Sequence, residues 1–147
     1  FGFELHDFTQ EILCRAVLEG HVLNLYEGFK KLPVSPKEIR LTGGISRSKV
    51  WRETIANIFD CEVIPVNGEG AAMGAALHAA WTFNKDKTIE EIADDFILLE
   101  ENERVKPNAE IKEIYNLLKE EYIALSMRIR GVQGKDPFKL RKQILSR

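Results

Sequence analysis

Residues 39–48 read IRLTGGISRS, and this stretch decides the fold. Its first four residues are apolar at alternate positions, which predicts a short strand, and the pair Gly43-Gly44 predicts a tight turn. Apolar side chains then recur at helical spacing over residues 51–59, behind serines that can cap a helix. The stretch therefore predicts a strand, a glycine turn and a helix in succession.

Residues 62–83 repeat this succession. The sequence EVIPV at 62–66 predicts a second short strand, Asn67-Gly68 predicts a turn, and residues 70–83 predict an alanine-rich helix. Two such units in a row indicate an α/β fold, with both strands parallel in one sheet and joined by right-handed crossovers.

A long amphipathic helix is expected ahead of this centre. Apolar side chains recur at helical spacing from residue 8 to about residue 31, and Pro33 ends the pattern. Asp7 and Gln10 supply a capping box at its start, in which a side-chain oxygen accepts a backbone N–H.

Two further helices are expected downstream. Thr88 and Glu91 form a capping box before a short helix that ends at Ala93. A charged connector at 100–106 then leads to a long helix over residues 111–129.

The end of the chain is basic. Gly131 can end the long helix in a left-handed cap. Residues 132–147 carry five basic side chains and one acidic one, a net charge of +4. We expect them to form a solvated basic tail beyond a domain of residues 1–131.

The composition is that of one ordinary soluble domain. The 147 residues include 21 Lys+Arg and 23 Asp+Glu, 44% are hydrophobic and 30% are charged. A net charge of −2 provides no overall attraction to nucleic acid or to an anionic membrane, and the apolar stretch at 71–83 is too short to span one. Neither partner is expected. The chain begins with Phe1 rather than Met, which suggests a fragment of a longer protein.

Cysteine and histidine give no sign of a metal site. Cys14 and Cys61 lack CxxC spacing and are expected to be buried, reduced thiols of a cytoplasmic protein. The three histidines are scattered without the spacing of zinc ligands, so no metal site is predicted. The two tryptophans, Trp51 and Trp81, occupy helical positions typical of core packing.

The first glycine turn is the main candidate binding site. Gly43 and Gly44 permit close approach of a ligand to the backbone, and the helix that follows offers unpaired N–H groups to a phosphate or a purine. On local physics alone, a purely structural turn is the simpler explanation of the two glycines, because any tight turn from a strand to a helix favours glycine. Ser48 has an alternative of its own, because a serine that caps the helix has its hydroxyl engaged by the backbone.

Gly70 and Gly74 form a second candidate feature. Four residues apart, they lie on one face of the predicted helix, where another backbone can approach closely. The face suits either a tightly packed helix pair or a helix that borders a ligand.

Four motifs, taken in order, resemble the FGGY family of carbohydrate kinases. They are FTQEILCRAVLEG at 8–20, TGGISRSKVWR at 42–52, ANIF at 56–59 with Val63, and EGAAMGAA at 69–76. The resemblance spans roughly residues 8–122 and is greatest to the xylulokinases. It implies the C-terminal half of an actin-like, ribonuclease H-like ATPase, present here as a fragment with few strands and long helices.

This resemblance also implies roles for particular residues. Gly43 and Gly44 would line the nucleotide, Ser48 would lie near the adenine, and Gly70 and Gly74 would belong to the helix that packs at the domain hinge. The chain departs from the family pattern in two places. Thr42 stands where many members have a third glycine, and Gln10 replaces the usual arginine.

The resemblance implies an ATP-dependent kinase that phosphorylates a sugar hydroxyl, with D-xylulose as the expected sugar. ATP and Mg²⁺ are the expected cofactors, and whether the protein forms a homo-oligomer is left open. In the family, the catalytic aspartate and the sugar pocket belong to an N-terminal domain that this chain lacks, so no catalytic residue is assigned. Two alternatives stay open: a non-catalytic actin-like regulatory domain, and an interaction module in which residues 111–129 pair with a partner helix.

Overall fold

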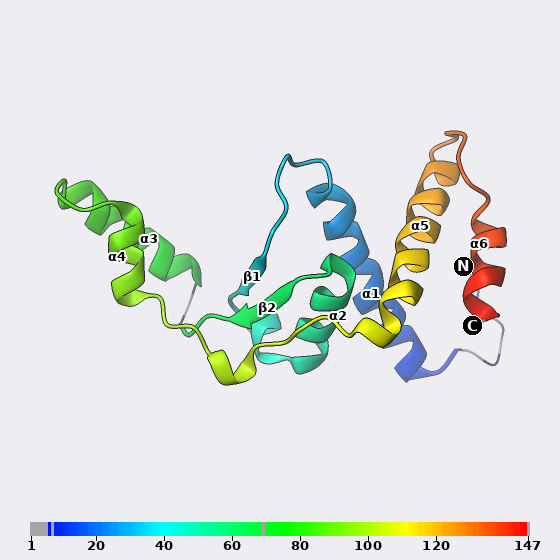
Figure 1. Cartoon of the computed structure of the whole chain (residues 1–147), viewed down its shortest axis with the longest axis horizontal. Coiled ribbons are helices and arrows are strands. Elements are labelled where there is room, and N and C mark those ends of the chain that lie inside the picture. Colours follow the sequence, from blue (N-terminus) through cyan, green and yellow to red (C-terminus); the bar gives the residue numbers. More distant parts are fainter. Residues whose placement is uncertain (1–5, 7, 69, 147) are drawn as a thin grey trace. The chain divides into compact units, whose positions relative to one another are not determined.

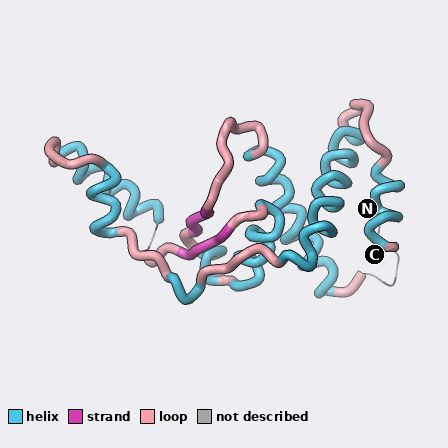
Figure 2. The backbone as a smooth tube through the Cα atoms, viewed as in Figure 1, coloured by secondary structure: helices cyan, strands magenta, loops and turns pink. Residues whose placement is uncertain are grey.

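The structure is a computed structural model that describes residues 6, 8–68 and 70–146. It divides into two units, one of residues 1–35, 54–60 and 107–147, the other of residues 36–53 and 61–106. Figure 1 labels the elements, and Figure 2 distinguishes the two short strands from the helices that make up most of the chain.

A pair of parallel strands forms the centre of the second unit. β1 (Glu38–Leu41) pairs with β2 (Glu62–Pro65), in a register that runs from Glu38 opposite Glu62 to Leu41 opposite Pro65. The 3-10 helix η2 (Gly44–Arg47) and helix α2 (Lys49–Phe59) connect the strands. The predicted strand, glycine turn, helix and parallel strand are therefore confirmed.

The segment after β2 contains two helices in contact with each other. α3 (Gly70–Phe83) is followed by α4 (Ile89–Phe96). The predicted capping box is present, because the Thr88 hydroxyl accepts the Glu91 N–H at 3.2 Å while the Glu91 carboxylate accepts the Thr88 N–H at 2.8 Å. The helix continues past the expected end at Ala93.

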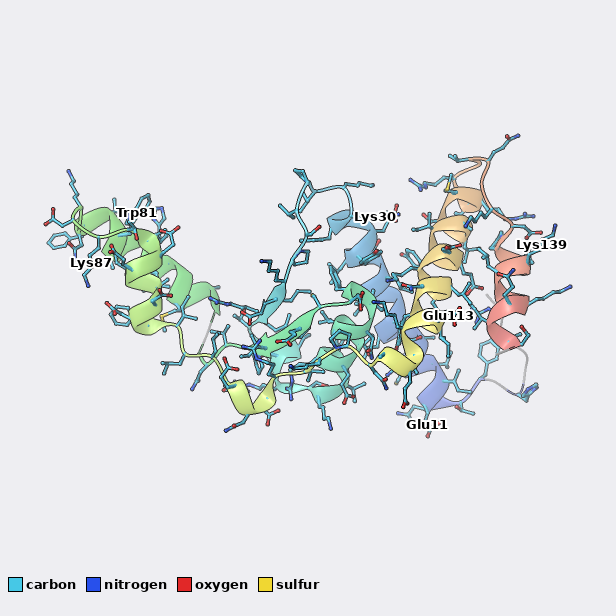
Figure 3. The ribbon with its side chains drawn as sticks, in the orientation of Figure 1. Glu11, Lys30, Trp81, Lys87, Glu113 and Lys139 are labelled. Carbon is cyan, nitrogen blue, oxygen red and sulfur yellow. The ribbon has the colours of Figure 1, made fainter. Side chains whose placement is uncertain are left out.

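The expectation that Trp81 packs in a core is wrong for this structure. Its side chain on α3 is 42% exposed and contacts the His78 ring edge-on at 5.7 Å between centroids (Figure 3). Leu77 on α3 and Ile92 on α4 are the buried residues of this helix pair. Two helices joined through so little apolar surface cannot enclose an indole ring.

The charged connector at 100–106 is more ordered than its composition indicates. It contains the 3-10 helix η3 (Glu101–Glu103), and Val105 exchanges two backbone hydrogen bonds with Val63 of β2, at 2.8 and 2.9 Å. The Glu100 N–H also donates to the Pro65 carbonyl at 3.0 Å. The connector therefore runs along β2 instead of standing free in solvent.

Helices build the first unit. They are α1 (Gln10–Phe29), the later part of α2, α5 (Lys112–Ile129) and α6 (Pro137–Leu145), with the short η4 (Ala109–Ile111) leading into α5. Phe59 at the end of α2 meets Tyr26 and Phe29 of α1 edge-on, at 5.4 and 5.6 Å between centroids. These rings supply apolar packing between α1 and α2.

A polar network joins α1 to α5. Glu19 accepts hydrogen bonds from Arg15 at 2.8 Å and from the Tyr115 hydroxyl at 3.0 Å, and Arg15 also donates to that hydroxyl at 2.6 Å. Burial and the charge of Glu19 raise the pKa of Tyr115 to about 12. Because α5 packs on α1 and α6 of its own chain, it does not present the unpartnered helix that an interaction module requires.

The start of α1 differs in detail from the prediction. Thr9 is the N-cap, and its hydroxyl accepts the Ile12 N–H at 3.4 Å. Asp7, expected to cap the helix, lies outside the described residues. Cys61 is buried as predicted, but Cys14 is exposed, because the buried residues of α1, Val22 and Leu23, lie further along the helix.

The predicted solvated tail is wrong over residues 137–145, which form α6 beside α5 (Figure 1). Asp136 caps the helix by accepting the Phe138 N–H at 2.9 Å, Pro137 occupies its first turn, and Pro137 and Leu140 are buried. Lys139 projects from the side of α6 that faces away from α5 (Figure 3). The prediction considered only the net charge of this segment and missed its amphipathic helix.

The predicted end of α5 at Gly131 is confirmed. Gly131 has φ of 70°, its N–H donates to the Arg128 carbonyl at 3.1 Å, and the Val132 N–H donates to the Met127 carbonyl at 2.9 Å. These two bonds define a Schellman cap, which suits glycine because of its positive φ. The cap turns the chain back so that α6 can pack on α5.

Candidate functional site

A cleft of about 980 Å³ opens where β1 and β2 end. In parallel α/β sheets, ligands bind beyond the carboxyl ends of the strands, which is the position of this cleft. It lies wholly within the second unit. Its walls are the turn after β1 with η2 (42–44, 46 and 47), Arg52 of α2, the turn after β2 (66–68), the first turn of α3 (70–72), Glu100 and Glu103.

The glycine turn after β1 is held in one shape. Gly43 has φ of 75° and ψ of −161°, a region that is essentially restricted to glycine. The N–H and the hydroxyl of Ser46 both donate to the Gly43 carbonyl, at 3.2 and 2.7 Å, and Ser46 is buried. The Ser46 hydroxyl therefore fastens η2 to the residue before it by donating to the Gly43 carbonyl.

Of the predicted binding residues, Gly43 and Gly44 line the cleft and Ser48 does not. Ser48 immediately precedes α2, where its carbonyl accepts the Arg52 N–H at 3.1 Å. Gly44 has open space where a Cβ would stand, so its backbone faces the cleft without cover from a neighbouring side chain.

The two glycines of α3 differ in their surroundings. A Cβ on Gly70 would overlap the side chain of Thr42, so the first turn of α3 lies directly against the turn after β1. The sequence predicted that another backbone would approach Gly70 closely, but the group that does so is the Thr42 side chain. At Gly74 the corresponding position is open, because no atom of the described residues outside the neighbouring helix backbone lies within 4 Å of it. Gly70 therefore belongs to the cleft wall, and Gly74 does not.

Arg52 was not recognised as a site residue from the sequence, yet it joins two walls of the cleft. It is 3% exposed, its Nη1 donates to the Ser46 carbonyl at 2.6 Å, and its Nη2 pairs with the Glu103 carboxylate. Its Nε has no hydrogen-bond partner among the described residues. One feature of the sequence could have indicated these contacts of Arg52. The residue follows Trp51 on a helix with a predicted buried face.

A second charged cluster lies at the opposite ends of the strands. Arg104 donates to Glu38 at 2.6 Å, to Glu62 at 3.0 Å and to Glu101 at 2.8 Å. Hydrogen bonding to Arg104 holds the pKa of Glu38 and of Glu101 below their usual value, and these bonds raise the pKa of Arg104. Because Glu38 and Glu62 are paired in register, Arg104 bridges two like charges on adjacent strands and reduces their repulsion.

Neither a metal centre nor a membrane span is found in the described part of the chain. It holds no group of three or more His, Cys, Asp or Glu side chains arranged to bind a metal ion. None of its helices combines the length and apolar character needed to cross a membrane.

The parallel strands and the cleft at their ends fit half of a domain with the actin-like ATPase fold, and solved structures agree. The chain matches xylulose kinase from Lactobacillus acidophilus with a TM-score of 0.70 and 25% identity, over 87% of this chain and 27% of that one. It matches xylulose kinase from Rhodospirillum rubrum with a TM-score of 0.71 and 24% identity, over 89% of this chain and 27% of that one.

Sequence comparisons identify the family. Residues 4–83 match the family model "FGGY family of carbohydrate kinases, C-terminal domain". A xylulose kinase of Haemophilus influenzae is 34% identical over 126 residues, which are 83% of this chain and 25% of that protein. A gluconokinase of Bacillus licheniformis is 33% identical over 133 residues, 86% of this chain and 25% of that protein. The chain belongs to the FGGY family of carbohydrate kinases, and it spans about a quarter of the length of these relatives.

Proposed function

We propose that the intact protein carrying this chain is a cytoplasmic, ATP-dependent carbohydrate kinase and that the cleft described above binds the nucleotide. The observation that carries the proposal is the position of Gly43 and Gly44. They line a cleft at the carboxyl ends of two parallel strands, inside the segment that matches the family. Backbone N–H groups at such a turn suit phosphate oxygens.

In the reaction, a sugar hydroxyl attacks the γ-phosphorus of ATP and ADP leaves. A carboxylate must accept the hydroxyl proton, and positive charge must gather around the transferring group. We assign neither role to this chain. Its part is to bind and orient the nucleotide through Gly43 and Gly44, with the α3 helix of Gly70 and Gly74 at the domain hinge. Ser48 lies outside the cleft wall, so we assign it no contact with the adenine.

Mg²⁺ is expected with ATP, but the described residues do not fit it. Of the carboxylates in the cleft wall, Glu100 and Glu103 stand without a third ligand group, and Glu103 is already paired with Arg52. We therefore assign no Mg²⁺ ligand among the described residues.

D-xylulose is the sugar that we propose, because xylulose kinases recur among the relatives in both sequence and structure. Gluconokinases match almost as well, so the test must compare both substrates. ADP release by the intact protein, measured with ATP and either D-xylulose or gluconate, should show turnover with D-xylulose. Turnover with gluconate alone would reject the sugar, and no turnover with any sugar would favour a non-catalytic actin-like domain.

A further inference from the structure

Arg52 fixes one acidic side chain relative to the glycine turn. Its guanidinium bonds the Ser46 carbonyl of η2 and pairs with Glu103 of η3. Because Arg52 is almost fully buried, this guanidinium cannot swing freely into solvent. The Glu103 carboxylate is therefore held at a defined place in the cleft wall, and a charged acceptor held in this way forms strong, directional hydrogen bonds.

Glu103 keeps capacity for a further donor. Arg52 engages its Oε2, its Oε1 accepts no hydrogen bond from the described residues, and its side chain is 53% exposed. Glu100, which also lines the cleft, adds a second negative charge close by in the sequence. A triphosphate is disfavoured beside these carboxylates, whereas groups of a nucleotide that donate hydrogen bonds are favoured.

We infer that Glu103 accepts a hydrogen bond from the ribose hydroxyls of the nucleotide and that Arg52 is the residue that positions it. The inference rests on the proposed function, because it needs a nucleotide in this cleft. Ribose presents two adjacent hydroxyl donors, and a carboxylate placed beyond a glycine turn recognises them in dinucleotide-binding folds. The phosphates are then left to the N–H groups of the glycine turn.

Calorimetry on the intact protein with ATP and with 2′,3′-dideoxy-ATP tests this inference. The wild-type protein should bind ATP about tenfold more tightly than the dideoxy nucleotide, the effect expected of one charged hydrogen bond. Glu103→Ala should bring the two affinities close together by weakening ATP alone. Arg52→Met should also reduce the ratio, and Arg52→Lys should restore part of it. Glu101→Gln, on the same η3 helix but paired with Arg104, is the matched control and should leave the ratio unchanged.

Three results would overturn the inference. An unchanged ratio in Glu103→Ala would show that Glu103 does not recognise ribose. Loss of discrimination between ATP and inosine triphosphate in that variant would show that Glu103 binds the adenine amino group instead. A wild-type protein that does not bind ATP at all would reject the proposed function along with the inference. Arg52→Met can fail to fold, but Glu103→Ala removes a half-exposed side chain and decides the matter without it.

Discussion

Gly43 and Gly44 are adjacent, but glycine is needed at the two positions for different reasons. Gly43 adopts backbone angles that side chains rarely allow, whereas Gly44 has no such constraint and leaves open space beside the cleft. Gly43 is needed for the backbone conformation of the turn, and Gly44 is needed to keep space for a ligand in the cleft. Substitutions at the two positions should therefore have separable effects.

Gly44→Val should weaken ATP binding to the intact protein at least tenfold, about 1.4 kcal/mol, with little change in sugar binding. The new side chain enters empty space, so the fold is kept while the nucleotide is obstructed. Paired calorimetry with ATP and with D-xylulose measures both affinities. An unchanged ATP affinity in a folded variant would reject the placement of the nucleotide on this turn.

Gly43→Ala should instead lower the free energy of unfolding by roughly 1 to 3 kcal/mol, the strain of a side chain in a region restricted to glycine. Urea unfolding of this variant beside Gly44→Ala provides the comparison. Equal stability of the two variants would contradict the different backbone requirements of the two positions.

Residues brought together over long distances in the chain were the hardest to foresee. The glycine turn is a local pattern, so its place at the end of β1 could be predicted from ten residues. Arg52 and Glu103 are 51 positions apart, and their pairing depends on how the connector lies along β2. Nothing in the composition of the connector indicates that it pairs with a strand.

At the scale of elements, α6 shows how charge can obscure a helix. Residues 132–147 are basic, but Asp136-Pro137 is a strong helix start, and Leu140 lies one turn further on, where it is buried. Arg141 reaches Glu121 of α5 at 2.8 Å, and Lys135 reaches Glu120 at 2.6 Å. Part of the basic charge therefore pairs with acidic side chains of α5.

Asp136→Ala should destabilise α6 by about 0.5 to 2 kcal/mol, because the Phe138 N–H loses its acceptor. Limited proteolysis should then cut within residues 137–145 sooner than in the wild-type chain. Lys139→Ala, a change on the outer side of the same helix, is the control. Equal cleavage rates in Asp136→Ala and the wild type would contradict the cap.

The Arg104 cluster should make stability depend on pH. Glu38 and Glu101 have pKa values below their usual value in the folded protein, so their contribution is complete above about pH 4.5 and is lost as the pH falls through the lowered values. Arg104→Met should therefore be less stable than the wild type at pH 7, and the difference should shrink towards pH 3. Urea unfolding at both pH values measures it.

Lys87→Met is the control for this experiment. It breaks an ion pair with Asp95 in which both side chains are at least half exposed, and such pairs contribute little. A difference between Arg104→Met and the wild type that stays constant between pH 7 and pH 3 would contradict the carboxylate origin of the effect.

At the scale of the whole molecule, the isolated chain should have no kinase activity and should bind ATP weakly. In our proposal the rest of the intact protein supplies further contacts to the nucleotide, and losing even about 3 to 4 kcal/mol of them weakens binding by two to three orders of magnitude. Reactants that are no longer held in line also lose the benefit of proximity. An ADP-release assay of the purified chain with ATP and D-xylulose checks this, and turnover above background would mean that one of its own carboxylates is catalytic.

The fold class could be recognised from the sequence because the order of strand, glycine turn and helix is itself local information. The division into two units could not be recognised, because its border lies inside α2, whose pattern is continuous from Lys49 to Phe59. The cleft could be predicted only in part. Its glycines could be recognised from the sequence, and Arg52 was indicated only by its place beside Trp51 on a helix with a buried face. Glu100 and Glu103 reach the cleft through packing that no local pattern records.

The outer edge of β1 bears on how the chain behaves in concentrated solution. Among the described residues β1 hydrogen-bonds with β2 alone, so its other side offers unpaired N–H and C=O groups to any strand that comes near. Two of the four residues of β1 are charged, and they pair with each other, because Arg40 donates to Glu38 at 2.9 Å. We therefore expect this edge to accept a strand from another chain, and a strand supplied in trans should pair with β1.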